Sequence, residues 1–426
     1  MEPPAARDFG GFGGVGVSEW REVTIGELCE EGGGNVQTGP FGSQLKASAY
    51  VPNGIPTVMP ANLVDFRISE EGIARISRED HQRLSKHHLR PGDIVYGRRG
   101  EIGRHALVTE KENGWLCGTG CLRIRFGDAE VEPRYVSYYL RQPEVIQMIL
   151  GMAVGTTMPN LNTTIVKSIP LRLPPLPVQR RIAQILGRLD DKIEVNRRIN
   201  RTLEAMARAL YRHWFVDFGP FQDGEFVESE LGLIPKGWEV KKLENVALIN
   251  PANIRKGQEP KWIKYVDISS VSDGIINQVK PMVFAEAPSR ARRLVSHGDI
   301  IWSAVRPERR AFSLIVHPDP ELVVSTGFVV VRPVEIPYSY LYTTLATQKF
   351  TDWLAARATG AAYPAVKGSD FKNAPILVPE QDVLSRFHRL TMPLFEQRYI
   401  LLRENRQLAA IRDYLLPKLL SGDAEP

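Results

Sequence analysis

Arginine and amide side chains gather on glycine-rich segments of this chain, where they could contact a polyanion. The run Gly97-Arg98-Arg99-Gly100 is the clearest case, and the sequence pI is near 9.0 with a formal net charge of +5. Backbone at glycine can approach a phosphate, arginine can bind a guanine edge through two hydrogen bonds, and glutamine or asparagine can bind adenine. The residues predicted to make such contacts are Ser43, Gln44, Lys46, Arg98, Arg99, Arg104, Thr156, Thr157, Asn160 and Asn162 in the first half of the chain, and Arg306, Arg309, Arg310, Tyr363 and Lys367 in the second. The alternative for any single residue is a solvated surface side chain, so the prediction rests on the set.

The chain lacks the sequence motifs of a self-sufficient DNA-modifying enzyme. It contains no Asn/Asp-Pro-Pro-Tyr/Phe tetrapeptide of the kind that holds a flipped adenine, no Gly-x-x-x-x-Gly-Lys-Ser/Thr segment and no convincing nuclease triad. The glycine-rich run at residues 11–16 matches a nucleotide-binding fingerprint only formally, since no strand pattern precedes it. Asp93 is better interpreted as a turn residue that leads into a strand. We therefore predict no catalytic residues, no cofactor and no metal site.

Composition predicts a two-domain globular protein. The chain has 426 residues, more than one core usually supports, with 43% hydrophobic and 24% charged residues. The cysteines Cys29, Cys117 and Cys121 are too few for a disulfide framework and lack a second ligand pair at zinc spacing, so we predict that they are reduced and structural. The sequence shows no secretory leader and no long apolar span, which predicts a cytoplasmic protein with no membrane partner.

The elements that must position the glycine-rich segments occur twice. Gly92-Asp93-Ile94-Val95 returns as Gly298-Asp299-Ile300-Ile301, a shift of 206 residues from 92 to 298. Asn200-Arg201-x-Leu203 returns as Asn405-Arg406-x-Leu408, a shift of 205 residues from 200 to 405. A near-constant shift through elements of different kinds predicts a tandem duplication, with one lobe and one helix per copy. Since the candidate ligand-facing segments differ between the copies, we expect two similar scaffolds that recognise two different targets.

Each lobe is predicted to be a mixed sheet with a few helices. Its apolar residues come in short alternating or β-branched runs, such as residues 94–96 and 121–126, with glycine and proline between them. The pattern also predicts a helix over residues 133–149.

The hydrophobic period changes after residue 177. From residue 178 apolar side chains recur three and four positions apart, and the second copy repeats the pattern in the same register. The polar faces are dense, so two such helices could bury their apolar stripes only against each other or against a partner, and a 37-residue helix at 178–214 would span about 55 Å. The predicted seam residues are Ile182, Ile185, Leu189, Asn196, Leu203, Met206 and Leu210 on the first helix and Leu394, Leu401, Leu408, Ile411 and Leu415 on the second.

These patterns predict an α+β fold with seven segments. They are a flexible leader at 1–17, a first lobe at 18–177, a first spacer helix at 178–215, a linker at 216–236, a second lobe at 237–379, a second spacer helix at 380–422 and a tail at 423–426.

Several motifs give the chain a resemblance to the specificity subunits of type I restriction-modification systems. They are the Trp-Glu-Val lobe start at 238–240, the two Gly-Asp-Ile strands, the run Pro-Leu-Arg-Leu-Pro-Pro-Leu-Pro-Val-Gln-Arg-Arg-Ile at 170–182, the helix end His-Trp-Phe-Val-Asp-Phe at 213–218 and the Leu-Pro-Lys-Leu-Leu-Ser-Gly close at 416–422. The resemblance covers residues 20–422. Val178-Gln179 and Gln381-Asp382 depart from it, because the family often has Glu-Gln there.

The resemblance implies that each lobe is a target recognition domain that reads one half of a bipartite double-stranded DNA site. It implies that the two helices form an antiparallel coiled coil that sets the gap between the half-sites. Two modification (methyltransferase) subunits and restriction (translocase and endonuclease) subunits would supply the chemistry. The chain itself would be non-catalytic.

Other classes remain open on the sequence alone. A protein-interaction scaffold would explain the duplication and the helices, but not arginine-bearing loops in both lobes. A DNA-recognition subunit of a related methylation-based defence system would explain both. A self-sufficient nuclease or methyltransferase would need a cofactor motif that the sequence lacks.

Overall fold

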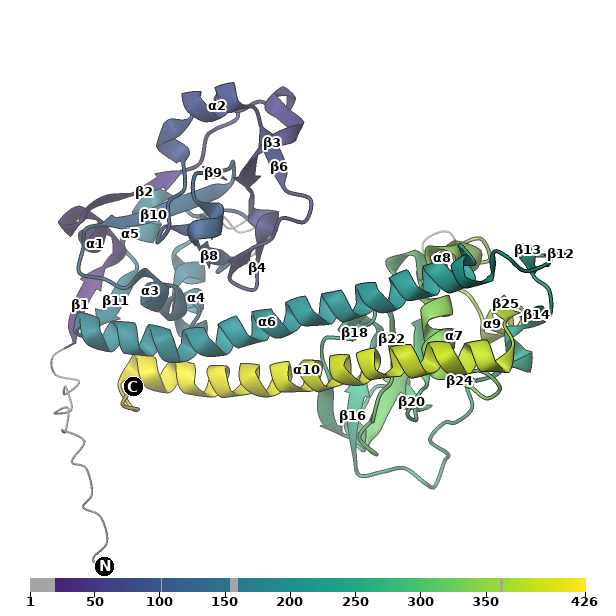
Figure 1. Cartoon of the computed structure of the whole chain (residues 1–426). Helices are drawn as coiled ribbons and strands as arrows, with labels where there is room; N and C mark the ends of the chain where they lie inside the picture. The colour runs from purple at the N-terminus through teal and green to yellow at the C-terminus, as the bar shows by residue number, and fades with distance from the viewer. Residues whose placement is uncertain (1–19, 101, 154–159, 361–362) are drawn as a thin grey trace, which may run out of the picture. The chain divides into compact units, whose positions relative to one another are not determined.

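The structure is a computed structural model that describes residues 20–100, 102–153, 160–360 and 363–426. The predicted leader at 1–17 and the predicted contact residues Thr156 and Thr157 lie outside the described residues. The chain divides into two compact units: unit 1 comprises Met1–Ile193 and Arg406–Pro426, and unit 2 comprises Glu194–Asn405. Each unit contains one mixed-sheet lobe and one part of each of two long helices, α6 (Leu176–Phe215) and α10 (Gln381–Ser421) (Figure 1). The fold class is therefore α+β, as predicted.

Unit 1 has a central antiparallel sheet in the order β2-β10-β7-β8 and a smaller sheet in the order β6-β3-β9, in which β3 and β9 are parallel. Two strand pairs, β1-β11 and β4-β5, complete the lobe. The strands are β1 (Arg21–Thr24), β2 (Gly33–Thr38), β3 (Tyr50–Val58), β4 (Leu63–Val64), β5 (Arg67–Ile68), β6 (Ala74–Ile76), β7 (Ile94–Gly97), β8 (His105–Leu107), β9 (Leu116–Cys117), β10 (Cys121–Gly127) and β11 (Pro170–Leu173). The helices are α1 (Ile25–Glu31), α2 (Arg78–Arg83), α3 (Pro133–Tyr139), α4 (Pro143–Met152) and α5 (Thr163–Lys167).

Unit 2 repeats this plan with a central sheet in the order β15-β24-β21-β22 and a second sheet in the order β19-β16-β23-β20. Its strands are β12 (Phe226–Ser229), β13 (Gly232–Pro235), β14 (Glu239–Lys242), β15 (Ala247–Ile249), β16 (Trp262–Val266), β17 (Val271–Ser272), β18 (Ile275–Ile276), β19 (Lys280–Val283), β20 (Ala291–Leu294), β21 (Ile300–Ser303), β22 (Phe312–Leu314), β23 (Leu322–Ser325), β24 (Phe328–Pro333) and β25 (Pro375–Val378). Its helices are α7 (Tyr338–Leu345), α8 (Gln348–Ala355) and α9 (Gly368–Lys372).

The helix predicted over residues 133–149 is broken into α3 and α4, so this prediction was wrong in detail. Gln142 is extended, with φ −62 and ψ 132, and Pro143 opens α4. A residue before proline is sterically pushed out of the helical region, which explains the break.

The duplication is repeated at the level of single contacts. In unit 1 the Arg125 guanidinium donates two hydrogen bonds, of 2.7 and 2.6 Å, to the carboxylate of buried Asp93. In unit 2 the Arg332 guanidinium donates two hydrogen bonds, of 2.8 and 2.7 Å, to the carboxylate of buried Asp299. Each aspartate also accepts a backbone N–H three residues before it, which fixes the turn into β7 or β21. The turn interpretation of Asp93 is therefore confirmed.

The three cysteines are free and buried, as predicted. Burial raises the pKa of the Cys29 thiol to about 11 and that of Cys117 to about 12. Both thiols are therefore protonated at neutral pH and serve as small apolar side chains.

Within each unit the parts of α6 and α10 pack side by side and run in opposite directions. In unit 1 Ile182 and Leu186 of α6 share an apolar core with Leu416, Leu419 and Leu420 of α10. In unit 2 Ala207, Tyr211 and Trp214 of α6 share a core with Leu384, Phe387 and Phe395 of α10. The core of each lobe continues into the helix pair, so each lobe is fixed to its own helix segments.

The buried stripe differs in part from the predicted seam. Ile182, Asn196 and Leu401 are buried, but Met206 is 51% exposed and Ile411 is 47% exposed, which corrects these two predictions. The remaining predicted seam residues are partly buried: Ile185, Leu189, Leu203, Leu210, Leu394, Leu408 and Leu415. At the two exposed sites the neighbouring residue, Ala207 or Arg412, faces the partner helix instead. The prediction chose the apolar residues Met206 and Ile411, whereas the small Ala207 and the charged Arg412 occupy the seam.

Asp190 of α6 is the main buried charge of the helix pair in unit 1. Its carboxylate accepts hydrogen bonds from Tyr138 at 2.8 Å, from Arg141 at 2.7 Å and from Arg412 of α10 at 2.8 Å. Burial by itself raises the pKa of Asp190, but Arg141 and Arg412 outweigh this and lower it to about 2. This carboxylate therefore ties α6, α10 and the lobe together while it is ionised.

We expect Asp190→Asn to destabilise unit 1 by about 3 kcal/mol at neutral pH, because it leaves the largely buried Arg141 without its anion and leaves Arg412 with only the exposed Asp413. The folded pKa of about 2 lies below the unfolded value of 3.8, so the stabilisation is present above about pH 4 and is lost as the pH falls through 2. Urea denaturation from pH 7 to pH 2 should therefore show the two proteins converging at the acid end.

Asp191→Asn is the matched control, since the neighbouring carboxylate is 56% exposed and pairs with Arg134 at the surface. We expect it to change the free energy of unfolding by less than about 1 kcal/mol. Equal effects of the two substitutions would contradict the role assigned to Asp190.

Candidate nucleic-acid interface

In unit 1 the structure brings together two candidate segments that are about sixty residues apart in sequence. The loop after β7 and the segment before α5 form a backbone bridge between Arg99 and Asn160. Leu161 donates its N–H to the Arg98 carbonyl at 3.0 Å, and the Arg98 Nε donates to the Leu161 carbonyl, also at 3.0 Å. Arg98 thus serves partly as the brace of the loop, and Arg99 and Asn162 are exposed beside it. Asn162 also caps α5 by accepting the N–H of Ile165.

The third predicted segment of unit 1 follows β2 and approaches the same loop. The Arg98 guanidinium lies 5.7 Å from the centroid of the Phe41 ring, and this ring is 54% exposed. Burial, with a smaller contribution from Arg99, lowers the pKa of Arg98. Gln44 is used locally, since its Oε1 accepts the Phe41 N–H at 3.2 Å, whereas Ser43 and Lys46 are exposed.

Arg104 stands at the other end of the β7–β8 loop. It is exposed and lines a cavity of about 280 Å³ together with Asp65 and Phe66 of the β4–β5 turn. The Asn160 Oδ1 is buried and lacks a hydrogen-bond partner in the part of the chain that the structure describes. The exposed donors of unit 1 therefore belong to one set of joined loops.

Unit 2 joins the corresponding segments in the same manner. Val305 and Ala365 form the equivalent backbone bridge, and Val366 donates its N–H to the Ala304 carbonyl at 2.9 Å. The Arg306 guanidinium lies 4.8 Å from the ring centroid of Tyr363, which is 71% exposed. Both units therefore present an arginine against an exposed aromatic ring at the joined loops. Arg309 and Lys367 are exposed near it.

Arg310 is held inside the protein. Its guanidinium donates to Asp273 at 3.0 Å, to the Thr351 hydroxyl at 2.7 Å and to the Ala346 carbonyl at 2.8 Å. These bonds join the β17–β18 turn to α8. Arg310 is therefore left out of the residues that we propose to contact DNA.

The arginine pairs of the two units do not occupy equivalent positions. By the backbone bridges, Arg99 of unit 1 corresponds to Val305 of unit 2. The two loops thus share a backbone frame but carry different side chains, which is the property expected of scaffolds that recognise different targets. Sequence patterns did not single out Phe41, although its place in the Gly-Pro-Phe-Gly run at 39–42 was a usable signal.

No helix in the described part of the chain is long and apolar enough to span a membrane.

Comparison with known proteins gives consistent matches. A family model described as the type I restriction modification DNA specificity domain matches residues 17–205. The type I restriction enzyme MjaIX specificity subunit of Methanocaldococcus jannaschii is 25% identical over 414 residues, covering 95% of this chain and 93% of the relative. The HindI specificity subunit of Haemophilus influenzae is 24% identical over 478 residues, covering 96% of this chain and 100% of the relative. The crystal structure of the type I restriction-modification S subunit from M. genitalium shares the fold, with a TM-score of 0.55 and 17% identity over 94% of this chain and 96% of that chain.

Two lobes of one plan, each with joined arginine-bearing loops and a share of two long helices, define a class of duplicated recognition proteins. Residues 17–205 match the type I restriction modification DNA specificity domain, and over nearly its whole length the chain is similar to type I restriction enzyme specificity subunits.

We expect Arg310→Lys to lower the free energy of unfolding of unit 2 by about 1–3 kcal/mol, since a lysine cannot reproduce the fork of hydrogen bonds and leaves buried acceptors unpaired. Arg309→Lys, one position away and exposed, should leave stability unchanged. Thermal denaturation of the two purified variants compares them directly. If Arg310→Lys were as stable as the wild type, the structural role assigned to Arg310 would be wrong, and Arg310 would again be a candidate for DNA contact.

Proposed function

We propose that this chain is the DNA-recognising specificity subunit of a type I restriction-modification complex, in which each lobe reads one half of a bipartite site. The observation that carries the proposal is the pair of backbone-bridged loops, Arg99 to Asn160 and Val305 to Ala365. The frames are alike and the side chains differ, so two different half-site sequences are the natural targets. The similarity to type I restriction enzyme specificity subunits supports the same conclusion.

Base recognition in unit 1 is assigned to Arg99, Arg104 and Asn162, with Ser43 and Lys46 placed for phosphate contacts. In unit 2 it is assigned to Arg306 and Arg309, with Lys367 on a phosphate. Arg99, Arg104 and Arg309 are exposed and Arg306 is partly exposed. Arginine can form the bidentate contact to guanine, whereas lysine supplies a point charge that suits phosphate. Phe41 and Tyr363 hold their partner arginines by cation–π contact and keep the guanidinium groups oriented.

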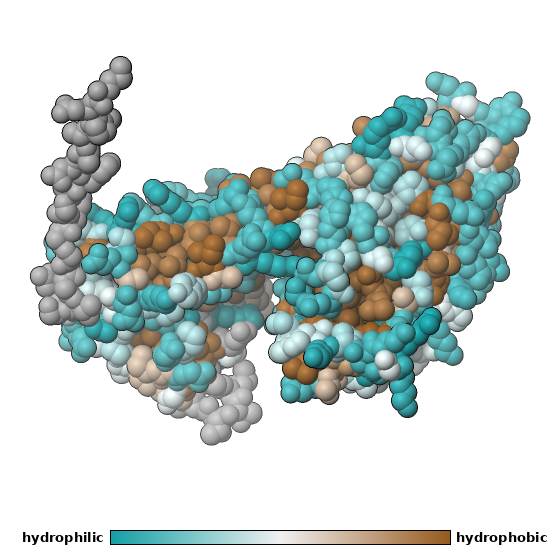
Figure 2. Space-filling model, turned by 90° about the horizontal axis from the view of Figure 1, so that it is seen from below, coloured by the Kyte–Doolittle hydropathy of each residue, from teal (hydrophilic) through white to brown (hydrophobic). Residues whose placement is uncertain are grey.

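Modification (methyltransferase) subunits are the proposed partners of the long helices. In unit 2 Val195, Ile199 and Met206 of α6 are 39%, 40% and 51% exposed, and they recur at intervals of four and seven residues, which places them on one helix face. On α10 Leu390 and Ile400 are 52% and 53% exposed. Figure 2 shows that apolar residues reach the surface in patches on the face it draws. Such apolar side chains suit a protein partner better than DNA. Restriction subunits would join through this assembly.

The half-site assignment is tested with the chain assembled with its modification subunits. We expect Arg99→Ala to relax one base position of one half-site and Arg309→Ala to relax one position of the other, at a cost of about 1–3 kcal/mol each. Mapping methylated bases in treated DNA measures both effects. The chain without modification subunits should transfer no methyl groups. An equal effect of either substitution on both half-sites would rule out the division between lobes.

The spacer role of the helices is tested by matched insertions. We propose four helix-forming residues between Ile193 and Glu194 and four between Asn405 and Arg406, where the two units meet in sequence and the contacts inside each unit are spared. The insertion adds about 6 Å and turns each helix about 40° beyond a full turn, while one base pair adds about 3.4 Å and turns DNA about 35°. We expect the unspecified gap to lengthen by about one to two base pairs, with both half-site sequences unchanged.

Four residues inserted in the turn between β12 and β13 provide the control, and the gap should then stay the same. Full activity with an unaltered gap in the helix variant would show that the helices do not set the spacing.

A further inference from the structure

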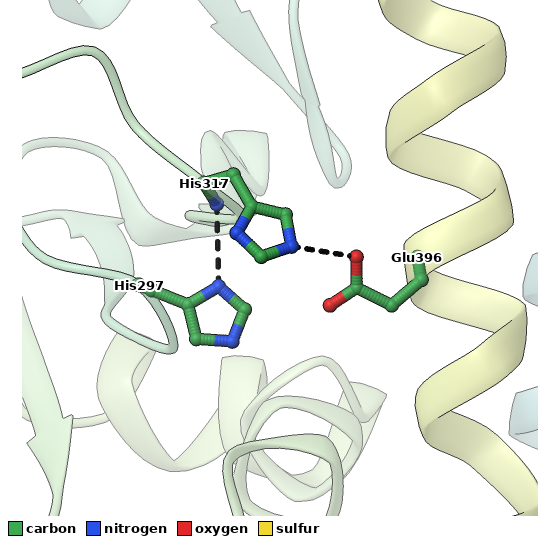
Figure 3. A group of neighbouring side chains, drawn as sticks. All are labelled: His297, His317 and Glu396. Carbon is green, nitrogen blue, oxygen red and sulfur yellow. Dashed lines mark hydrogen bonds and ion pairs between the residues drawn. The ribbon is translucent and has the colours of Figure 1, made fainter.

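Two histidines and one glutamate of unit 2 lie together although they are distant in sequence. His297, His317 and Glu396 each offer a ligand atom, and these atoms all lie within 4.8 Å of one another (Figure 3). None of them belongs to the loops proposed to read DNA. Sequence patterns predicted no metal site here, because 20 and 79 residues separate the three side chains and no known spacing joins them.

The fold of the central sheet brings the two histidines together. His297 lies in the turn before β21 and His317 follows β22, and these two strands pair with Ile300 opposite Leu314. Asp299 holds this region in place, because its carbonyl accepts the Ile315 N–H at 2.8 Å and its carboxylate is gripped by Arg332. His317 itself has a positive φ of 42, and the Tyr399 hydroxyl of α10 donates to its carbonyl at 3.1 Å. The site is therefore fixed by buried structure on the sheet side and by α10 on the other.

His317 contacts both of the other side chains of the cluster (Figure 3). His317 Nε2 lies 2.9 Å from the Glu396 carboxylate, which reaches over from α10. His297 Nδ1 accepts the backbone N–H of His317 at 3.2 Å, so its lone pair is directed at the His317 backbone beside the cluster. The two imidazoles stack with centroids 4.6 Å apart.

We propose that His297, His317 and Glu396 bind a divalent transition metal ion of the zinc type, which staples the β21–β22 end of the sheet to α10. Two imidazoles and one carboxylate are a common donor set for Zn²⁺, which prefers ligand distances of about 2.0–2.2 Å and tetrahedral geometry. Ligand atoms in such a site are about 3.4 Å apart, so atoms that lie up to 4.8 Å apart need to approach each other by up to about 1.4 Å. Both histidines are exposed and can rotate.

A water molecule would complete the coordination. The ion would replace the His317 N–H at the lone pair of His297, and solvent would satisfy the released N–H. The role assigned to the ion is structural because its ligands come from the sheet end and from α10. The proposal goes beyond the recognition function and is independent of it.

The competing explanation is a plain ion pair between His317 and Glu396. In that case His297 serves only as the acceptor of the His317 backbone N–H. A metal ion would use all three side chains as ligands. The two explanations are separated by whether the purified chain binds the metal at all.

The experiment uses the full chain stripped with a chelator and then titrated with Zn²⁺ alone, with bound metal counted by mass spectrometry after dialysis. Co²⁺ is a spectroscopic probe of the same site, since a tetrahedral site gives intense visible absorption. We expect one bound Zn²⁺ per chain, a tetrahedral Co²⁺ spectrum and a higher melting temperature with Zn²⁺. His297→Gln, Glu396→Gln and His317→Asn should each weaken binding by more than about tenfold. Asparagine is chosen for position 317 because it tolerates a positive φ.

His88→Gln in unit 1 is the matched control. His88 stacks on His81 with centroids 3.7 Å apart, and no carboxylate joins this pair among the residues that the structure describes. The control should keep full Zn²⁺ binding. The proposal is overturned if the wild-type chain holds no Zn²⁺ after dialysis, or if the three variants bind it as tightly as the wild type. The melting temperatures of the metal-free variants, compared with the metal-free wild type, report whether folding is intact.

Discussion

Buried charges between the long helices and the lobes are the constraint on which the rest of the structure depends. In unit 1 Asp190 receives Arg141 of the lobe and Arg412 of α10. In unit 2 Arg398 of α10 lies 3.0 Å from Glu204 of α6 and donates to the Gly274 carbonyl of the lobe at 3.0 Å. Each cluster joins three elements. A buried charge that loses its partner is strongly destabilising, so the helices cannot slide along each other without a large cost.

The same charges help to position the arginine-bearing loops through a short strand pair in each unit. In unit 2 the β17–β18 turn accepts two hydrogen bonds. Arg398 of α10 donates to the Gly274 carbonyl, and Arg310 donates to the Asp273 carboxylate. The turn is therefore fixed both to α10 and to the loop that carries Arg309. In unit 1 Arg67 of β5 donates to the Asp190 carbonyl at 3.0 Å, and Phe66 lies against Arg141. The hairpin in each unit is thus packed between the helix pair and the loop. The helix pair therefore fixes the hairpin, and the hairpin in turn fixes the loop.

Sequence patterns predicted the duplication, the α+β class and the long helices, because these depend on repetition and on hydrophobic period. They failed where a residue type was a poor guide to its surroundings. Met206 is apolar yet exposed. Arg412 is charged yet faces the seam, because its guanidinium donates a hydrogen bond to Asp190 there. Arg310 resembles a DNA contact in sequence, but its partners Asp273 and Thr351 come from elsewhere in the chain.

Polar residues in the helix pair also decide which helix pairs with which. Duplication gives α6 and α10 similar apolar patterns, so apolar burial alone would permit either helix to pair with its own counterpart in another copy of the chain. In the shared register, shifted by 205 residues, Ala207 of α6 occupies the position of Arg412, and Ala409 of α10 occupies the position of Glu204.

Self-pairing of α6 would therefore place Asp190 against Ala207, and self-pairing of α10 would place Arg398 against Ala409. The first arrangement takes Arg412 away from Asp190, which keeps Arg141, and the second takes Glu204 away from Arg398. Each removes an ion-pair partner from a buried charge and is therefore destabilising. Only α6 with α10 satisfies both charges. The buried ions thus make the pairing of unlike helices the favoured one, which apolar residues in those positions could not do.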